Sequence, residues 1–228
     1  RVLRQAQTSL ADLVANGSID PSLEGVLRAV VAKRASFLVT GGTGSGKTTL
    51  LAALLGCVPE TERLLIIEDT PELAPEHPHV VTLVSRRANA EGRGEISMSL
   101  LLRQALRMRP DRIVVGEIRG AEVVELLAAL NTGHDGGAGT VHANSVDEVP
   151  ARMEALAALG GLDRVALHSQ LAAAVHVVLG MERTPAGRRL AHVGVLEGNP
   201  VTPRLVWTVK DGPRAGFDAL CARLGVGQ

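Results

Sequence analysis

The sequence predicts an α/β fold with helices on both faces of a mostly parallel sheet, followed by a small C-terminal β appendage. Three observations carry this prediction. Short aliphatic runs alternate with segments of helical periodicity from residue 22 to residue 174, and a glycine-rich loop joins one such run to the next helix. After residue 175 the pattern changes to β-like runs separated by turn signals. Alternating strands and helices are typical of a parallel sheet that is buried on both sides.

Each element is placed by its apolar periodicity and by the residues that start or stop it. Pro21 and Ser22 favour a helix start, and Pro110 stops a later helix. Ser145 and Glu148 have the Ser-x-x-Glu spacing of a capping box. In chain order we expect a helix at residues 22–34, a strand at Phe37–Thr40, a helix at Lys47–Leu55, strands at 64–67 and Val80–Val84, a helix at 97–108, a strand at 113–115, a helix at 121–130, a strand at 139–142, and helices at 145–159 and 165–174.

The C-terminal segments have β character. Runs at residues 176–181, 190–196 and 205–210 are separated by turn signals at 184–187 and 198–200. We expect these runs to form the β appendage on the main sheet. The chain is therefore divided into residues 1–35, an N-terminal linker and helix, and residues 36–228, the catalytic core with its appendage.

Composition narrows the possible functions. The formal net charge is zero and aromatic residues make up only 1% of the 228 residues, so nothing global attracts nucleic acid or anionic lipid. Apolar stretches are too short to span a bilayer, and residues 1–13 lack the apolar core of a secretory signal. Cys57 and Cys221 lie far apart and form no metal-ligand pattern. We therefore expect a cytoplasmic protein.

One segment follows the pattern Gly-x-x-x-x-Gly-Lys-Ser/Thr between an expected strand and an expected helix. Its glycines allow backbone N–H groups to surround a phosphate, and the helix N-terminus favours an anion. Lys47 is expected to reach the β- and γ-phosphates, and the Thr48 hydroxyl to ligate Mg²⁺. A glycine-rich turn without function is disfavoured by this context. The predicted ATP-binding residues are Gly41, Gly42, Thr43, Gly44, Ser45, Gly46, Lys47, Thr48 and Thr49.

Hydrolysis also needs a carboxylate that orients water, and others that hold the metal shell. Glu117 and Glu68 each follow an aliphatic strand, and ligands bind at the carboxyl ends of parallel strands. Either carboxylate could instead cap a helix or pair with Arg112 or Arg119. His142 ends another strand, and by itself it is more simply a structural histidine.

Four segments in sequence order resemble the Walker A, Asp, Walker B and His boxes of secretion ATPases: residues 41–48, 63–73, 109–120 and 131–145. The resemblance is greatest to the tight-adherence branch, near the VirB11-type ATPases of type IV secretion, and extends from about Thr8 to about Glu197. It implies a RecA-like P-loop NTPase core. It also implies a separate N-terminal domain, which we expect this chain to lack.

The resemblance also implies roles for particular residues. Glu117 would position or activate water, and Glu68 would join Thr48 in holding Mg²⁺ through water. His142 would sense the γ-phosphate or couple it to motion. The basic residues that match the family's site would contact phosphate or a neighbouring subunit, although surface salt bridges remain an equal alternative. They are Arg86, Arg93 and Arg119.

The leading hypothesis is an enzyme that hydrolyses ATP to power pilus assembly or protein secretion. The resemblance implies a homo-oligomer, a hexamer, at the inner face of the cytoplasmic membrane, with inner-membrane platform proteins as partners and no direct contact with nucleic acid. A second hypothesis is a nucleic-acid-translocating motor of conjugation, which the neutral charge and scarce aromatics disfavour. A third is a nucleotide-binding scaffold without turnover.

Overall fold

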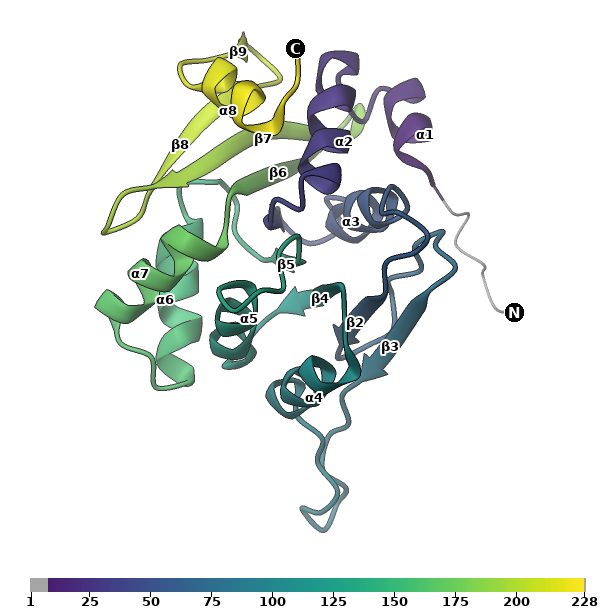
Figure 1. Ribbon diagram of the computed structural model, residues 1–228, viewed down its shortest axis with the longest axis vertical. Coiled ribbons are helices and arrows are strands. Elements are labelled where there is room, and N and C mark those ends of the chain that lie inside the picture. The colour runs from purple at the N-terminus through teal and green to yellow at the C-terminus, as the bar shows by residue number, and fades with distance from the viewer. Residues whose placement is uncertain (1–7, 228) are drawn as a thin grey trace.

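A nine-stranded sheet runs through the molecule, as the computed structural model shows for residues 8–227 (Figure 1). Its strands lie in the order β3-β2-β4-β5-β1-β6-β7-β8-β9. The strands are β1 Phe37–Thr40, β2 Leu64–Glu68, β3 Val80–Val84, β4 Arg112–Ile118, β5 Ala138–Val141, β6 Val177–Thr184, β7 Gly187–Glu197, β8 Thr202–Thr208 and β9 Gly212–Pro213.

The first six strands in this order are parallel, and the remaining strands pair antiparallel from β6 onwards. Helices connect successive parallel strands except β2 and β3, which residues 69–79 join without a helix, whereas short turns connect the antiparallel strands. The C-terminal strands extend the main sheet beside β1 and form its β appendage. The predicted α/β fold is therefore confirmed.

Helices cover both faces of the sheet (Figure 1). Alternate residues of each central strand point to opposite sides, so that Phe37 and Val39 join one apolar cluster while Leu38 joins the other. The first cluster packs against α1 Leu10–Ala15, α2 Glu24–Ala32, α3 Lys47–Leu55 and α8 Phe217–Leu224. The second packs against α4 Met98–Ala105, α5 Glu122–Leu130, α6 Val149–Leu159 and α7 Arg164–Ala174. Short 3₁₀ helices at Pro21–Leu23 and Leu106–Met108 adjoin α2 and α4.

Several local features differ from the sequence prediction. The helices α1 and α8 were not predicted, because each is short and is held in place by the buried leucines that it adds to the first cluster. The capping box at Ser145 and Glu148 was wrong, since α6 begins only at Val149. Glu148 instead accepts a hydrogen bond from the backbone N–H of Asn144 (2.8 Å), which closes a turn before the helix.

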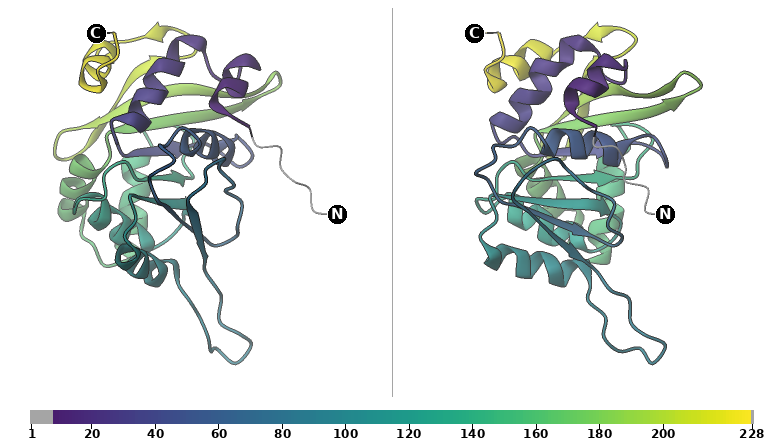
Figure 2. Two further views of the ribbon diagram at one scale, coloured as in Figure 1. Left: turned by 45° about the vertical axis from the view of Figure 1, so that its right-hand side comes forward. Right: turned by 90° about the vertical axis from the view of Figure 1, so that its right-hand side faces the viewer.

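Two segments project beyond the carboxyl ends of the parallel strands (Figure 2). One is the loop at residues 85–97, in which Arg86 and Ile96 form an antiparallel bridge. The other is the hairpin formed by β6 and β7. Among residues 8–227, no helix is long and apolar enough to cross a bilayer.

Candidate functional site: a phosphate-binding loop beside an acidic cavity

The loop between β1 and α3 has the backbone conformation that its glycines allow. Gly41, Gly44 and Gly46 have φ values of 148°, 71° and 99°, a region that side chains with a Cβ rarely adopt. Gly46 is the N-cap of α3, and no side chain caps this helix. The first N–H groups of α3 therefore have no side-chain acceptor among the described residues, which agrees with the predicted P-loop.

Lys47 lies in the first turn of α3 with its ammonium group turned back over the loop. Its Nζ atom donates hydrogen bonds to the carbonyl oxygens of Gly41 (2.9 Å) and Gly42 (3.2 Å). Burial lowers the pKa of Lys47, while the nearby Glu117 carboxylate acts in the opposite direction. The loop thus concentrates a positive charge where the phosphates of a nucleotide would lie.

A small cavity of about 40 Å³ opens next to the first turn of α3. It brings together four of the residues that the sequence singled out from three separate segments: Thr48, Glu68, Glu117 and Arg119. The order β2-β4-β5-β1 explains this, because the ends of β2 and β4 lie on the same side of the P-loop strand. The other lining residues are Asp69, Thr70, Glu72 and Gly116.

Glu68 is the buried carboxylate of this cavity, with an exposed fraction of 3%. Its Oε1 atom accepts hydrogen bonds from the backbone N–H groups of Glu72 (3.1 Å) and Leu73 (2.9 Å). Its Oε2 atom is buried and has no partner in the described part of the chain. Burial raises the pKa of Glu68, and the two N–H groups lower it in part. One oxygen therefore holds a loop, and the other is free to bind a ligand.

Gly116 makes room for this carboxylate. A Cβ atom at Gly116 would lie 2.6 Å from the Cγ atom of Glu68, closer than real atoms approach. The register between β4 and β5 also shifts after Val115, which places Gly116 and Glu117 in a bulge. The glycine of the Walker B-like strand thus determines where the carboxylate of the neighbouring strand can lie.

Glu117 is more accessible, and it is held by an arginine. Its Oε2 atom accepts hydrogen bonds from the Nε atom (2.8 Å) and the Nη2 atom of Arg119. The Nη1 atom of Arg119 donates to Asp69 (2.8 Å), so one guanidinium bridges two carboxylates. Hydrogen bonding to Glu117 raises the pKa of Arg119. The pairing of Glu117 with Arg119, which the sequence left open, is present in this structure.

The residues of the cavity fit a magnesium site that is completed by a bound phosphate. Carboxylate and hydroxyl oxygens are the ligands that Mg²⁺ prefers, and it is usually held by only one or two protein groups together with phosphate oxygens. Thr48 and the unpaired Oε2 atom of Glu68 supply such oxygens. Within residues 8–227, no group of three or more His, Cys, Asp or Glu side chains is placed to hold a metal ion.

His142 directly follows β5, between the P-loop strand and the Walker B-like strand. Val141, the last residue of β5, is the register partner of both Thr40 and Ile118. His142 therefore lies between the start of the P-loop and the end of β4, although it does not line the acidic cavity. Its position agrees with a sensing role, which stays a prediction.

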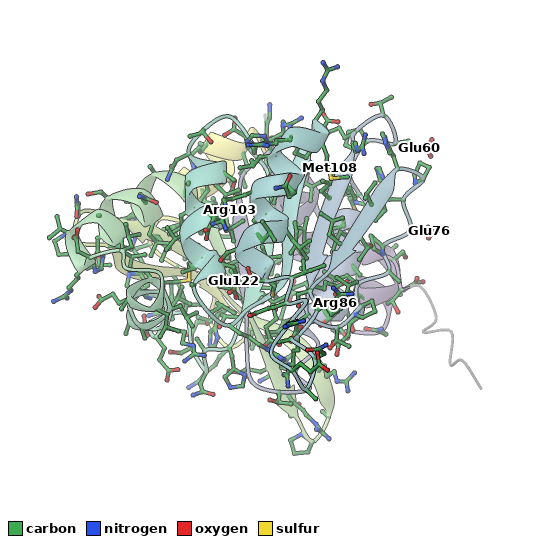
Figure 3. The ribbon with its side chains drawn as sticks, turned by 90° about the horizontal axis from the view of Figure 1, so that it is seen from below. Glu60, Glu76, Arg86, Arg103, Met108 and Glu122 are labelled. Carbon is green, nitrogen blue, oxygen red and sulfur yellow. The ribbon has the colours of Figure 1, made fainter. Side chains whose placement is uncertain are left out.

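Arg86 and Arg93 are not brought to the cavity. Both lie in the projecting loop at residues 85–97, where the Nε atom of Arg86 donates to the carbonyl oxygen of Gly94 (2.8 Å). Figure 3 shows Arg86 and Glu122 at the end of the sheet where β3 and β4 finish, opposite Met108 and Glu60. The two arginines thus lie at the end of the sheet where the parallel strands finish, as the P-loop does. They follow the edge strand β3 and do not line the cavity.

Sequence reasoning did not assign a role to every residue of the site. Asp69 and Glu72 line the cavity, and Asp69 shares the Arg119 guanidinium with Glu117. The acidic run after β2 was visible in the sequence. Which of its members face Thr48 depends on how the backbone turns after Glu68, where the N–H groups of residues 72 and 73 close onto the carboxylate.

The glycine-rich loop before α3, with carboxylates from two neighbouring parallel strands, defines the chain as a P-loop NTPase domain. A family model described as "Type II/IV secretion system protein" matches residues 1–186. Because the match covers more than half of the sequence, the chain belongs to this family. The predicted membership of the secretion ATPase superfamily is confirmed, while the finer assignment to the tight-adherence branch stays a prediction.

Curated relatives agree with this family. A putative conjugal transfer protein of Mycobacterium tuberculosis is 67% identical over 197 residues, which make up 86% of this chain and 56% of that protein. The probable conjugal transfer protein TrbB of Sinorhizobium fredii is 36% identical over 188 residues, or 81% of this chain and 55% of that protein. The chain therefore spans about half the length of the curated relatives that it matches.

Solved structures show the same arrangement. The VirB11 ATPase of the Brucella suis type IV secretion system, in complex with sulphate, matches with a TM-score of 0.67 and 28% identity over 82% of this chain and 62% of that chain. The pilus retraction motor PilT with bound ADP matches with a TM-score of 0.57 and 27% identity over 87% of this chain and 53% of that chain. The fold is therefore that of the ATPase domains of secretion and pilus machines.

Proposed function

We propose that this chain is a motor domain that binds ATP with Mg²⁺ and hydrolyses it. The observation that supports this proposal most strongly is the acidic cavity beside α3, where Thr48, Glu68 and Glu117 lie together at the P-loop. A phosphate-binding loop alone would only bind a nucleotide. Hydrolysis also requires oxygens for the metal shell and a base that accepts a proton from water, and the carboxylates beside the loop supply both.

In the proposed reaction, the backbone N–H groups of the P-loop and Lys47 bind the β- and γ-phosphates. Thr48 and, through water, Glu68 would hold Mg²⁺, which would supply charge neutralisation at the phosphate oxygens. Glu117 exchanges its hydrogen bonds with Arg119 for a water molecule and accepts a proton from it. The water oxygen bonds to the γ-phosphorus as the bond to the β-phosphate oxygen breaks, which yields ADP and phosphate.

Release of phosphate from ATP tests this proposal directly. Turnover should require Mg²⁺ and should disappear when the metal is chelated with EDTA. A chain that binds ATP with Mg²⁺ but releases no phosphate at any protein concentration would contradict the proposal. That outcome would favour the third hypothesis, a nucleotide-binding scaffold.

We also propose that hydrolysis powers pilus assembly or protein secretion at the inner face of the cytoplasmic membrane. The match to the secretion family supports this role. We further propose that the motor is a hexamer with inner-membrane platform proteins as partners. If neighbouring subunits complete each site, the ATPase rate should rise faster than linearly with protein concentration. A strictly linear dependence, together with a monomeric mass at all concentrations, would contradict the hexamer.

Conjugation is the second candidate, and the descriptions of the relatives favour it. The Mycobacterium tuberculosis and Sinorhizobium fredii relatives are both described as conjugal transfer proteins. Direct translocation of DNA is disfavoured, because the net charge is zero and the sequence contains only two Phe and one Trp to stack on bases. Stimulation of the ATPase by single-stranded or duplex DNA at physiological salt would support the DNA motor.

A further inference from the structure

The hairpin formed by β6 and β7 lies directly against the P-loop. A Cβ atom at Gly41 would lie 2.5 Å from the carbonyl oxygen of Met181, so only glycine permits this approach. A Cβ atom at Gly44 would lie 3.6 Å from the Nη1 atom of Arg183, and one at Gly46 would lie 3.3 Å from the Cδ atom of Arg188. The same glycines that shape the phosphate-binding loop thus face two arginines of the hairpin.

Strand alternation explains why these two side chains face the loop. Val177, Leu179 and Met181 of β6 belong to the apolar cluster on the α3 side of the sheet. Arg183 is the next residue of β6 on that side, and Arg188 occupies the equivalent place on β7, two residues before the buried Leu190. A register shift between Gly180 and Met181 marks a bulge at the base of this end of the hairpin.

The charge of this pair is not compensated within the described part of the chain. Arg183 and Arg188 are direct register partners across the hairpin, an arrangement in which like charges repel. Both side chains are exposed, and within residues 8–227 neither has an ion-pair or side-chain hydrogen-bond partner. By contrast, the adjacent Arg189 pairs with Glu182 at 3.6 Å. An anion between the two guanidinium groups would relieve the repulsion.

We propose that Arg183 and Arg188 bind the phosphate chain of the nucleotide from the side of the P-loop opposite the acidic cavity. The sheet order places β6 on one side of β1, and places β5, β4 and β2 on the other. Phosphate oxygens held by the P-loop would therefore meet oxygen ligands for Mg²⁺ on one side and guanidinium groups on the other. This inference rests on the proposed binding of nucleotide at the P-loop and adds two residues of the same subunit.

Guanidinium groups suit this position because they donate several hydrogen bonds in a fixed plane and stay charged. Charge-assisted hydrogen bonds to phosphate are about twice as strong as neutral ones. The Nη1 atom of Arg183 faces Gly44 within the loop, where the N–H groups of a P-loop surround phosphate. The expected ligand group is therefore the phosphate chain, and its recognition should not depend on the base.

The experiment compares inorganic tripolyphosphate, ATP and GTP as ligands of the whole chain, each with Mg²⁺ and measured by calorimetry. Arg183→Gln and Arg188→Gln should each raise the Kd of all three ligands by about tenfold, which corresponds to about 1.4 kcal/mol. Arg189→Gln is the matched control and should change these Kd values by less than twofold, because its partner is Glu182. The slope of log Kd against log salt should also become shallower in the first two variants only.

Two results would overturn the inference. Unchanged Kd values for tripolyphosphate in Arg183→Gln and Arg188→Gln would show that the arginines do not contact phosphate. Losses confined to ATP and GTP, with tripolyphosphate binding intact, would assign the pair to the ribose or base instead. Binding by the wild-type chain and its loss in Lys47→Ala test the P-loop itself, so a failure of the proposed function is distinguishable. The melting temperature of each variant shows that it folds.

Discussion

The two sides of the P-loop are chemically opposite. On the side of β4 and β2, the carboxylates Glu68, Asp69 and Glu117 gather around the first turn of α3, and Arg119 bridges two of them. On the side of β6 and β7, Arg183 and Arg188 stand together without a partner among the residues that the structure describes. Lys47 lies between the two sides.

This difference arises because the strands on the two sides of β1 carry side chains of opposite charge. The acidic side is partly neutralised within the chain, which suits groups that must exchange partners during a reaction. On the basic side, the repulsion between Arg183 and Arg188 is not neutralised by a described residue, which favours the binding of an anion. Removing groups from each side should therefore have different consequences: loss of turnover on the acidic side and loss of affinity on the basic side.

The largest effect is expected for Lys47, which both sides share. Lys47→Ala removes the cation that the loop places on the β- and γ-phosphates, and ATP affinity should fall by about a hundredfold or more, roughly 2.7 kcal/mol or more. Calorimetric titration with ATP and Mg²⁺ measures this loss. Affinity like that of the wild-type chain would contradict the P-loop assignment. Neither the acidic nor the basic side would then face a bound nucleotide.

Glu117→Gln should separate turnover from binding on the acidic side. The amide keeps the shape of the side chain and can accept hydrogen bonds from Arg119, but it cannot take a proton from water. We expect ATP affinity within about twofold of the wild-type value and a loss of about a hundredfold or more in phosphate release, a barrier increase of roughly 2.7 kcal/mol.

The rate of phosphate release decides between the two carboxylates. If Glu117→Gln turns over within about twofold of the wild-type rate, or roughly 0.4 kcal/mol, the catalytic role would move to Glu68. The exposed Glu76→Gln serves as a control for the loss of one carboxylate charge, and it should leave turnover unchanged.

His142→Ala should uncouple nucleotide state from assembly. We expect ATP affinity to stay within about tenfold, or about 1.4 kcal/mol, because His142 does not line the cavity. The difference in oligomerisation between ATP-bound and ADP-bound protein should largely disappear, as judged by sedimentation. Normal hydrolysis and assembly would move the sensing role to Arg119, whereas an unfolded variant would mean that His142 is structural.

Glu68→Gln should stabilise the chain while it impairs hydrolysis. Burial raises the pKa of Glu68, so the folded state holds the proton more tightly than the unfolded state does. Stability is therefore lost as the pH rises from the ordinary glutamate pKa through the raised pKa. The amide oxygen can still accept from residues 72 and 73, and no buried charge remains. We expect a gain of about 1 kcal/mol at pH 7.5, or roughly 2–4 °C in Tm.

Thermal unfolding between pH 4 and pH 8 measures this effect. The gain of Glu68→Gln over the wild-type chain should shrink towards pH 4, where the wild-type carboxyl is protonated. A variant less stable than the wild type at pH 7.5 would show that the ionised carboxylate stabilises the fold. Burial of Glu68 would then not lower the stability of the acidic side, as the comparison assumes.

The smallest effect is expected in the projecting loop. Arg93→Gln should change ATP affinity of the dilute chain by less than about twofold, because Arg93 lies beyond β3 and outside the cavity. The same variant can lower the rate at high protein concentration if the loop reaches a neighbouring subunit. A large loss of affinity in the dilute chain would mean that the loop folds back onto the P-loop. Arg93 would then contribute to nucleotide binding together with Arg183 and Arg188.

The sequence alone located the elements that local chemistry determines. The strand Phe37–Thr40 and the helix Lys47–Leu55 have the predicted bounds, because an apolar run, positive-φ glycines and a helix-forming segment adjoin one another in the chain. Glu117 could be proposed because it lies just after the aliphatic run at residues 113–115, although β4 itself continues through Glu117 to Ile118. Glu68 was proposed on the same ground, and the resemblance to the family boxes implied the sensing role of His142.

Only the tertiary structure decided which side chains meet. The order of the strands brings Glu68 and Glu117 to one side of the P-loop and Arg183 and Arg188 to the other. The space at Gly116 likewise matters only because Glu68 packs there. Periodicity and propensity report the environment of one segment, whereas these contacts join residues far apart in the chain, and only the pairing of strands and the packing of side chains determine such contacts.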